Sequence, residues 1–452
     1  MNISRFALLA MFLMITSCSY ITRKLQHVES TSINSYPAAR ALNPELKKPL
    51  IVSLAQYKSV HTRHHKDNHL AIALAASGGG YRAANFTLGI LLGLEKTHSQ
   101  RLNSNLLEQV DYYSSVSGGG FGVGYYLTQL HNYLIKNGSI ASFSLNENVH
   151  NMLRYNTNPL RQDLTGYLFF GEDRGLELEK RLNETLLATP DGGLLLGDIF
   201  VPNGSPEPVR LPYWITNATI FQNATGFSFA PDILKRYRII EFFHNNTPYK
   251  LLGHFSDPGY GYGVPFSVGM TASASVPFAI PPTTLTSNGC PGANCYLQLL
   301  DGGIADNLGV YTALGLLLQD KNKVKVLIIV DASRTSTQPY SQFMVPPTSV
   351  GLLWRLATAS TDSNLAHIKP NVSFVSRDIL CGSGASNVIV IYLDLSHYPD
   401  ARRIGTQLTM SSNEQQFLLK IGQEVVMKDK KIQTLLAQIE RGKFTLGQCP
   451  RG

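Results

Sequence analysis

The chain has 452 residues, of which 44% are hydrophobic and 15% are charged. The charged fraction lies well below the roughly 25% of an average soluble domain, which excludes a disordered polyelectrolyte and indicates a large buried interior. The formal net charge of +8 favours anionic partners. The basic residues form no long arm and no recognisable nucleic-acid module, so we expect no nucleic-acid binding.

The first 17 residues have the pattern of a secretory signal peptide. A single basic residue, Arg5, precedes an apolar run at 6–15 that is too short to span a bilayer. The sequence Ile-Thr-Ser-Cys at 15–18 then resembles a bacterial lipobox, whose cysteine is diacylated and becomes the mature N-terminus. We therefore expect a lipid on Cys18, and a two-chain anchor would hold the protein stably on a membrane. A signal peptide with an incidental cysteine is the alternative.

Residues 18–67 are expected to form a polar tether, because they contain several prolines and no sustained periodicity. The histidine-rich segment HTRHHKDNH at 61–69 matches no known metal-ligand spacing, so we interpret it as solvated linker rather than a metal site. Signal, lipobox and tether together predict an exported, membrane-anchored bacterial lipoprotein of the cell envelope, at the outer membrane or the periplasmic face.

The four remaining cysteines are Cys290, Cys295, Cys381 and Cys449. An even number of cysteines in an exported protein predicts disulfides. The short segment CPGANC favours a bond between the first two, which would leave the last two to pair. Since four cysteines allow three connectivities, the pairing stays open.

Two strand–turn–helix units follow one another at the start of the predicted folded domain, 68–452. The run HLAIALAA at 69–76 is continuously apolar, as in a buried parallel strand, and SGGGYR leads from it into a helix predicted at 83–96. The pattern recurs with a strand at 110–116, the turn SGGG, and a helix at 121–138 that ends on a glycine.

Strands and helices continue to alternate along the rest of the chain. Further elements are predicted as strands at 212–220, 237–244, 324–332 and 387–395, and as helices at 308–320 and within 414–443. Such alternation indicates a parallel sheet covered by helices on both faces. The sequence thus predicts a single α/β domain with the C-terminal helices packed onto it.

The segment SVSGG at 115–119 is close to the nucleophile-elbow pattern G-x-S-x-G. In that pattern a serine occupies a sharp turn between a strand and a helix, at the positive end of the helix dipole. Ser117 occupies the serine position, whereas Ser115 replaces the first glycine and departs from the pattern. Ser117 is the candidate nucleophile. Ser115 is a poorer candidate, because Tyr113 would then take a position that must be small.

Three consecutive glycines, Gly78, Gly79 and Gly80, lie one strand–turn–helix unit upstream. Their N–H groups are not covered by side chains, which suits an oxyanion hole. A phosphate-cradling loop is the alternative, but no Lys-Ser/Thr pair follows the glycines. Arg82 comes next, where its guanidinium would bind a phosphate or a carboxylate, or form only a surface salt bridge.

Asp301 ends an apolar run and precedes two glycines, so we expect its carboxylate at a strand end beside a turn. An aspartate before glycines is often only a turn former. In a partly apolar site, however, the carboxylate can act as a base toward a serine hydroxyl.

Taken in order, these motifs resemble those of the patatin-like phospholipase superfamily, and within it the catalytic core of cytosolic phospholipase A2. SGGGYRA is similar to the glycine-rich oxyanion loop, SVSGG to the nucleophile elbow, and DGG to the segment that holds the dyad aspartate. A fourth segment, TASASVPFAIPP at 271–282, is similar to the Ala-Ser-x-x-x-Pro segment that precedes the aspartate. The resemblance covers residues 70–310.

The resemblance implies a three-layer α/β/α fold with a mostly parallel central sheet. It implies a lipid acyl hydrolase of the phospholipase A or lysophospholipase type, in which Ser117 and Asp301 form a catalytic dyad that acts through an acyl-enzyme. Gly78, Gly79 and Gly80 would form the oxyanion hole. Arg82 would hold the phosphate of a membrane phospholipid, although other acyl-ester lipids fit the same chemistry. Neither a cofactor nor a metal is implied.

Two other functions stay open at the level of the sequence. One is an α/β-hydrolase esterase with a triad of Ser117, Asp331 and His397, whose order along the chain fits that fold. That esterase would leave the DGG segment and Arg82 unexplained. The other is a catalytically inactive lipoprotein that binds a lipid or a protein partner on a hydrolase scaffold.

Overall fold

The computed structural model of the chain describes residues 52–57, 70–149, 174–202, 211–333 and 388–444, except positions 245–246, 252–253, 256, 258, 278, 291–292, 321–323, 396 and 407–409. The predicted signal peptide, Cys18, most of the tether with its histidine segment, Cys381 and Cys449 lie outside the described residues, as do the side chains of Cys290 and Cys295. Lipidation and disulfides therefore stay predictions. Among the described residues, no helix combines the length and the apolar character needed to cross a membrane.

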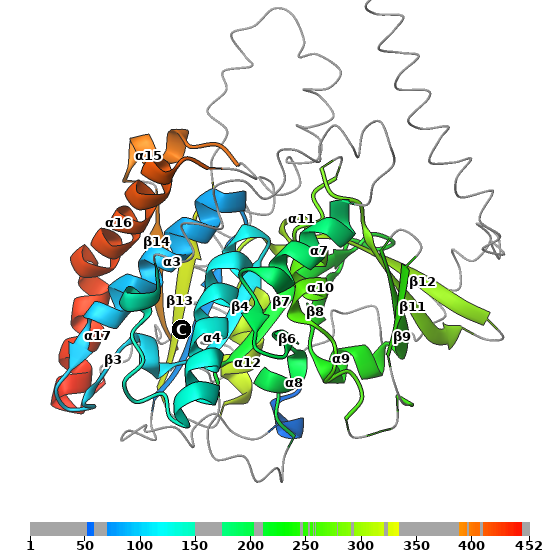
Figure 1. Cartoon of the computed structure of the whole chain (residues 1–452). Helices are drawn as coiled ribbons and strands as arrows, with labels where there is room; N and C mark the ends of the chain where they lie inside the picture. Colours follow the sequence, from blue (N-terminus) through cyan, green and yellow to red (C-terminus); the bar gives the residue numbers. More distant parts are fainter. Residues whose placement is uncertain are drawn as a thin grey trace, which may run out of the picture.

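A ten-stranded mixed sheet forms the centre of the described part of the chain (Figure 1). Its strand order is β10-β9-β11-β12-β7-β4-β1-β13-β14, with β8 paired to β7, and two short hairpins, β2-β3 and β5-β6, lie apart from it. The strands are β1 (Leu70–Ala76), β2 (His98–Ser99), β3 (Ser104–Asn105), β4 (Val110–Val116), β5 (Ala188–Thr189), β6 (Gly192–Gly193), β7 (Tyr213–Ile220), β8 (Gly226–Phe229), β9 (Ile239–His244), β10 (Thr247–Lys250), β11 (Thr283–Cys290), β12 (Ala293–Asp301), β13 (Val324–Asp331) and β14 (Val388–Asp394).

The half of the sheet formed by β7, β4, β1, β13 and β14 is parallel. Every residue of LAIALAA in β1 and of VDYYSSV in β4 is buried. Burial on both faces explains why LAIALAA is a continuous apolar run rather than an alternating one. The strands predicted at 69–76, 110–116, 212–220, 324–332 and 387–395 correspond to these five strands, so the parallel sheet is confirmed here.

The other half of the sheet is antiparallel. β12 pairs with β7, β11 with β12, β9 with β11, and β10 with β9. The strand predicted at 237–244 is β9, which lies in this antiparallel half. The sequence predicts no strand for β8, β10 or β11, because they are short or polar, as in TTLTSNGC of β11. A strand without a clear apolar pattern gives no periodic signal.

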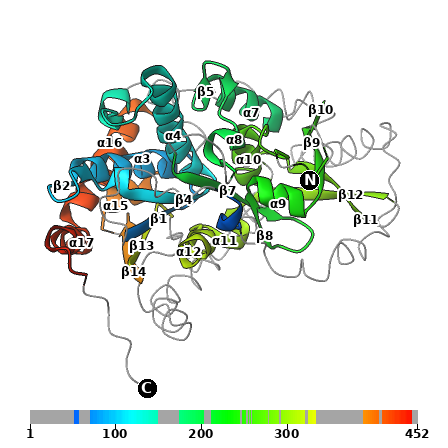
Figure 2. The ribbon, with the colours of Figure 1, turned by 90° about the horizontal axis from the view of Figure 1, so that it is seen from below.

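Helices cover both faces of the sheet, as Figure 2 shows from below. α3 and α4 pack on one face and α12 on the other, which confirms the predicted three-layer α/β/α fold. The helices are α3 (Gly80–Lys96), α4 (Gly118–Asn137), α7 (Arg174–Glu184), α8 (Leu196–Ile199), α9 (Pro231–Arg236), α10 (Phe266–Ser273), α11 (Gly303–Asp306), α12 (Val310–Gln319), α15 (Pro399–Arg403), α16 (Ser412–Lys428) and α17 (Lys430–Arg441), with the 3-10 helices η3 (Leu54–Gln56) and η5 (Leu107–Gln109).

The C-terminal helices lie against the outer side of α3 (Figure 1), where α16 makes the main contact. The stretch predicted as helical at 414–443 forms two helices, α16 and α17. It is interrupted at Asp429, whose carboxylate accepts hydrogen bonds from the N–H groups of Lys431 and Ile432 and so begins α17.

Candidate active site

The register of three neighbouring strands brings the candidate nucleophile and the candidate base together. β4 ends at Val116, which lies opposite Asn217 of β7. The next residue, Ser117, is therefore level with Ala218. On the other side of β7, Asp301 is paired with the same Ala218. The Ser117 hydroxyl faces the Asp301 carboxylate closely enough to favour its ionised form.

Ser117 lies on the sharp turn between β4 and α4. Its backbone has φ 48° and ψ −127°, a conformation that residues other than glycine rarely adopt. The turn is tight, since a Cβ added to Gly118 would lie 2.0 Å from the carbonyl oxygen of Gly80. Strain that the surrounding structure maintains at one residue is typical of functional sites. Ser117 therefore has the geometry of a nucleophile elbow.

Ser115, which replaces the first glycine of the elbow pattern, points away from the turn. Its hydroxyl is fully buried and accepts a hydrogen bond from the indole N–H of Trp214 at 2.8 Å. A Cβ added to Gly120 would come 3.1 Å from the Ser115 oxygen. A serine fits at this position because the residue that faces it in α4 is a glycine. The elbow therefore keeps its geometry although Ser115 replaces the first glycine of the pattern.

Asp301 is the last residue of β12 and is only 8% exposed. One of its oxygens, Oδ1, accepts a hydrogen bond from the N–H of Gly303 at 2.7 Å. Burial raises the pKa of Asp301 to about 6, because it disfavours the charged form more than the hydrogen bond from Gly303 and the nearby Ser117 hydroxyl favour it. A carboxyl group with a pKa near neutrality can both take up and release a proton.

The three glycines of the predicted oxyanion hole are not equivalent. The N–H of Gly78 donates to the carbonyl of Asn307 at 3.0 Å, so it is not available to a ligand. Gly79 and Gly80 have positive φ angles of 143° and 61°, which glycine adopts most readily, and they begin α3. Within the described ranges their N–H groups have no acceptor. These two amides, rather than all three, are therefore the candidate donors beside Ser117.

Asn307 lies between the glycine loop and the turn that follows Asp301. The sequence alone does not identify it as part of the site. Its Oδ1 would be 2.5 Å from a Cβ on Gly78 and 2.7 Å from a Cβ on Gly303. Both positions must therefore be glycine for the buried Asn307 side chain to fit. A polar residue that closes the segment DGGIADN was the only signal available in the sequence.

Arg82 does not lie where a phosphate ligand would need it. Its side chain is 2% exposed, and its Nε and Nη1 donate to the carbonyl oxygens of Ala332 and Ile404 at 2.9 and 2.7 Å. Its Nη2 lies against the glycine loop, 3.0 Å from where a Cβ on Gly79 would be. The structure therefore gives no support to the prediction that Arg82 holds a lipid phosphate, and that role stays a prediction. The guanidinium supports the loop from inside the protein, a direction that the motif alone does not reveal.

The alternative triad is not assembled. His397 is exposed and follows β14, and two strands, β1 and β13, separate β14 from β4. Three inter-strand spacings put the two strands about 14 Å apart. Asp331 accepts hydrogen bonds from the N–H and the hydroxyl of Ser333 and from the hydroxyl of Tyr392. The geometry favours a dyad of Ser117 and Asp301 over a triad with His397.

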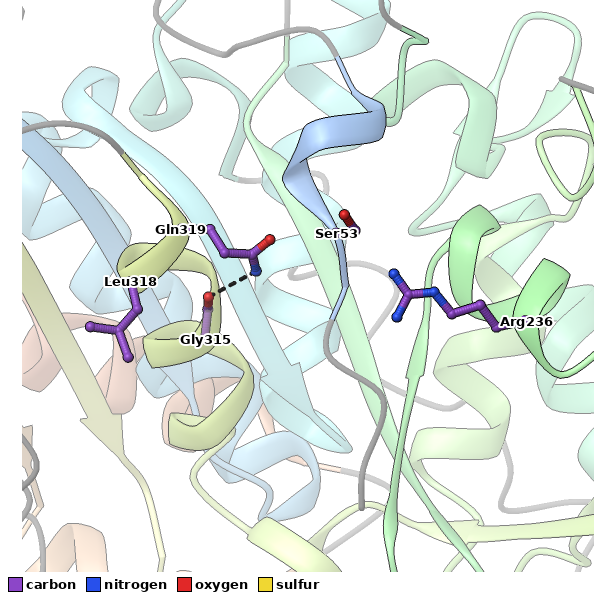
Figure 3. Close-up of a pocket in the computed structure, with 5 residues that line it drawn as sticks. All are labelled: Ser53, Arg236, Gly315, Leu318 and Gln319. Carbon is purple, nitrogen blue, oxygen red and sulfur yellow. Dashed lines mark hydrogen bonds between the residues drawn. The ribbon is translucent and has the colours of Figure 1, made fainter. Parts of the chain in front are cut away.

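A separate pocket of about 370 Å³ lies at the opposite edge of the sheet. Figure 3 shows the residues that line it, which are Ser53, Arg236, Gly315, Leu318 and Gln319. Asp320, which follows the lining residue Gln319, accepts a hydrogen bond from Tyr112 near the start of β4. Ser117 follows the other end of the same strand. The pocket is therefore not part of the candidate catalytic site. Nowhere in the described ranges do three or more His, Cys, Asp or Glu side chains gather as a metal site would require.

Among solved structures, human GIVD cytosolic phospholipase A2 in complex with methyl gamma-linolenyl fluorophosphonate inhibitor and terbium chloride is similar to this chain. The two are 13% identical with a TM-score of 0.39, over 90% of this chain and 63% of that chain, so this chain spans less than two thirds of the human enzyme. VipD from Legionella pneumophila is 13% identical with a TM-score of 0.29, over 86% of this chain and 71% of that one. No curated protein sequence matches the chain.

A family model described as patatin-like phospholipase matches residues 74–314. The matched segment is more than half of the chain, and it contains Ser117, Asp301 and the glycines of the loop. The protein therefore belongs to the patatin-like phospholipase family.

Proposed function

We propose that the protein is a lipid acyl hydrolase of the phospholipase A or lysophospholipase type, which cleaves carboxylic esters with Ser117 and Asp301. The observation that carries the proposal is the position of the Ser117 hydroxyl, on a strained and tight turn, beside the buried carboxylate of Asp301, whose ionised form it favours. A weak nucleophile becomes effective when an adjacent base accepts its proton.

In the first half of the reaction, Ser117 Oγ attacks the carbonyl carbon of the ester while Asp301 takes up the hydroxyl proton. Negative charge develops on the former carbonyl oxygen and is bound by the N–H groups of Gly79 and Gly80 and by that of Gly118, the residue after the nucleophile. The bond to the leaving alcohol oxygen then breaks. The proton on Asp301 passes to that oxygen, and the acyl group stays on Ser117.

In the second half, Asp301 removes a proton from a water molecule whose oxygen attacks the acyl carbon. The intermediate collapses, the fatty acid leaves, and the proton returns to Ser117. A pKa of about 6 supports this double role, because Asp301 is mostly ionised at neutral pH and yet basic enough to accept a proton.

The geometry of the site does not identify the head group of the lipid. Family membership supports a phospholipid. Arg82 adds no support for a phosphate, because its side chain is buried and bonded to the backbone. The proposed substrate class is therefore a membrane lipid with an acyl ester.

The test uses full-length wild type and the Ser117→Ala variant on mixed vesicles of phospholipid, lysophospholipid and monoglyceride. We expect the wild type to release fatty acids, seen by mass spectrometry, and to form a covalent adduct on Ser117 with a fluorophosphonate probe. The alanine variant should do neither and should melt at a similar temperature. A folded wild type that neither releases fatty acid nor reacts with the probe, under conditions in which a known lipase does, would instead identify an inactive binding scaffold.

We also propose that the protein is a membrane-anchored lipoprotein of the cell envelope, lipidated on Cys18. The support is the order of signal peptide, small residues and cysteine at 1–18. Expression of the full chain and of Cys18→Ser, followed by separation of membranes, tests this. We expect the wild type in the membrane fraction with the mass of the attached lipid. A serine variant that stays equally membrane-bound contradicts the anchor.

A further inference from the structure

Ser273, the last residue of α10, is a buried serine whose polar atoms meet both sides of the candidate site. It is 2% exposed. Its hydroxyl oxygen accepts a hydrogen bond from the backbone N–H of Ser117 at 2.8 Å. Its carbonyl oxygen accepts one from the N–H of Gly302, the residue after Asp301, at 3.2 Å. One residue therefore contacts the elbow and the turn that carries the carboxylate.

The hydroxyl of Ser273 is itself held in place. It donates its proton to the carbonyl of Asn217 in β7 at 2.5 Å, which leaves its oxygen lone pairs directed to the N–H of Ser117. Asn217 lies opposite Val116, the residue before the elbow. The hydroxyl thus connects the elbow to the strand that lies between the two reacting residues.

The N–H of Ser117 needs such a partner. Ser117 is the N-cap of α4, so this N–H has no acceptor within the helix, and the residue has the strained φ of 48°. A strained conformation persists only where the surroundings determine it. Among the described residues, Ser273 supplies the acceptor at the strained position.

We infer that Ser273 is a positioning residue for the nucleophile. Its hydroxyl fixes the backbone of Ser117, so that the Ser117 hydroxyl keeps facing the Asp301 carboxylate. The inference rests on the proposed function. Ser273 touches no reacting atom, and its effect is on the orientation of Ser117. Small displacements of a reacting group are costly, since a shift of about 1 Å can lower a rate by about 10²-fold.

A matched pair of variants tests the inference. Ser275 is also fully buried and lies two residues further along, but its hydroxyl donates to the carbonyl of Thr271 within its own segment, at 2.9 Å. We expect Ser273→Ala to lower kcat, and the rate of fluorophosphonate labelling, by about tenfold or more with KM unchanged, because it leaves the N–H of Ser117 without an acceptor. Ser275→Ala should keep kcat within about twofold. Ser273→Thr, which keeps the hydroxyl, should recover most of the kcat lost in the alanine variant.

Equal kcat for the two alanine variants, or a threonine variant as slow as Ser273→Ala, would overturn the inference. If Ser273→Ala does not fold, Ser273→Cys against Ser275→Cys gives the same comparison, since a thiol keeps the volume but is a weak acceptor. A wild type without any esterase activity refutes the proposed function instead. In that case crystal structures of the wild type and Ser273→Ala decide: a Ser117 backbone unchanged in the variant contradicts the positioning role, and a relaxed φ supports it.

Discussion

The parallel and the antiparallel halves of the sheet contribute different parts of the candidate site. The parallel half supplies Ser117 and the glycine loop, each on a turn where a buried strand leads into a helix. The antiparallel half supplies Asp301 from the end of β12. β7 lies between them, parallel to β4 and antiparallel to β12, so the two candidate catalytic residues meet across the boundary between the two halves.

Ser117 and Asp301 come together at this boundary because β12 pairs with β7 over only a few residues. In a parallel sheet, the carboxyl ends of neighbouring strands lie at the same edge. An antiparallel strand that ran the full length of its neighbour would have its carboxyl end at the opposite edge. β12 pairs with β7 only over Leu299–Asp301 and stops there. The short overlap keeps the carboxylate at the edge where the nucleophile lies.

The largest effect is expected when the contribution of the antiparallel half is removed. Asp301→Asn should lower kcat by roughly 10²–10⁴-fold, because the amide cannot accept the Ser117 proton. His397→Ala should leave hydrolysis unchanged, since His397 is exposed at the far side of the parallel half. Fatty-acid release by both variants measures this. The reverse result would restore the triad.

A second large effect is expected at the contact between the two turns of the parallel half. Gly118→Ala should destabilise the protein by about 3 kcal/mol or more, because its Cβ would lie 2.0 Å from the Gly80 carbonyl oxygen. The control is Gly138→Ala at the end of α4, where φ is +68° and nothing lies within 4 Å of an added Cβ. We expect a cost there of about 1–2 kcal/mol. Urea unfolding measures both, and equal costs would contradict the close contact of the turns.

Arg82→Met separates a support for the loop from a phosphate ligand. Loss of the guanidinium leaves the carbonyls of Ala332 and Ile404 without these donors and loosens the glycine loop. We expect kcat to fall by about 10²-fold, equally for phospholipid and for monoglyceride. Arg403→Met, which changes an exposed arginine, is the control. A fall in kcat for phospholipid but not for monoglyceride would instead indicate that Arg82 binds the phosphate of the substrate.

The pH dependence reports on the carboxylate at the boundary. In the proposed mechanism Asp301 acts as a base only when it is ionised, and burial raises its pKa to about 6. Activity should therefore be level above pH 6 and fall about tenfold for each unit below it. An ordinary, unburied aspartate would keep its activity down to about pH 4. A profile of kcat/KM between pH 4 and 9 distinguishes the two.

The smallest effect on activity is expected at the opposite edge of the sheet. Tyr57 donates a hydrogen bond to the Asp232 carboxylate at 2.8 Å, and its ring lies tilted against that of Tyr213 at the start of β7. Tyr57→Phe should lower the free energy of unfolding by about 1–3 kcal/mol, because the carboxylate loses a buried donor. kcat should not change. A fall in kcat at unchanged stability would mean that the two edges are coupled.

The two halves also differ in how much of them the sequence could predict. The parallel half has long apolar strands and glycine turns, so its strands, its helices and Ser117 were predictable. In the antiparallel half, polar strands such as β11 gave no periodic signal. The roles of Gly78 and Arg82 depend on partners that are distant in sequence, Asn307 for the first and Ile404 for the second. A local motif identifies residue types, but it does not contain these partners.

The bond from Arg82 to Ile404 joins residues that are 322 positions apart. During synthesis, the glycine loop, Ser117 and Asp301 all leave the ribosome before Ile404 does. Until then the guanidinium lacks its backbone acceptor at Ile404, and the glycine loop lacks part of its support. Under the proposed function, hydrolytic activity would therefore require synthesis of the chain at least as far as Ile404.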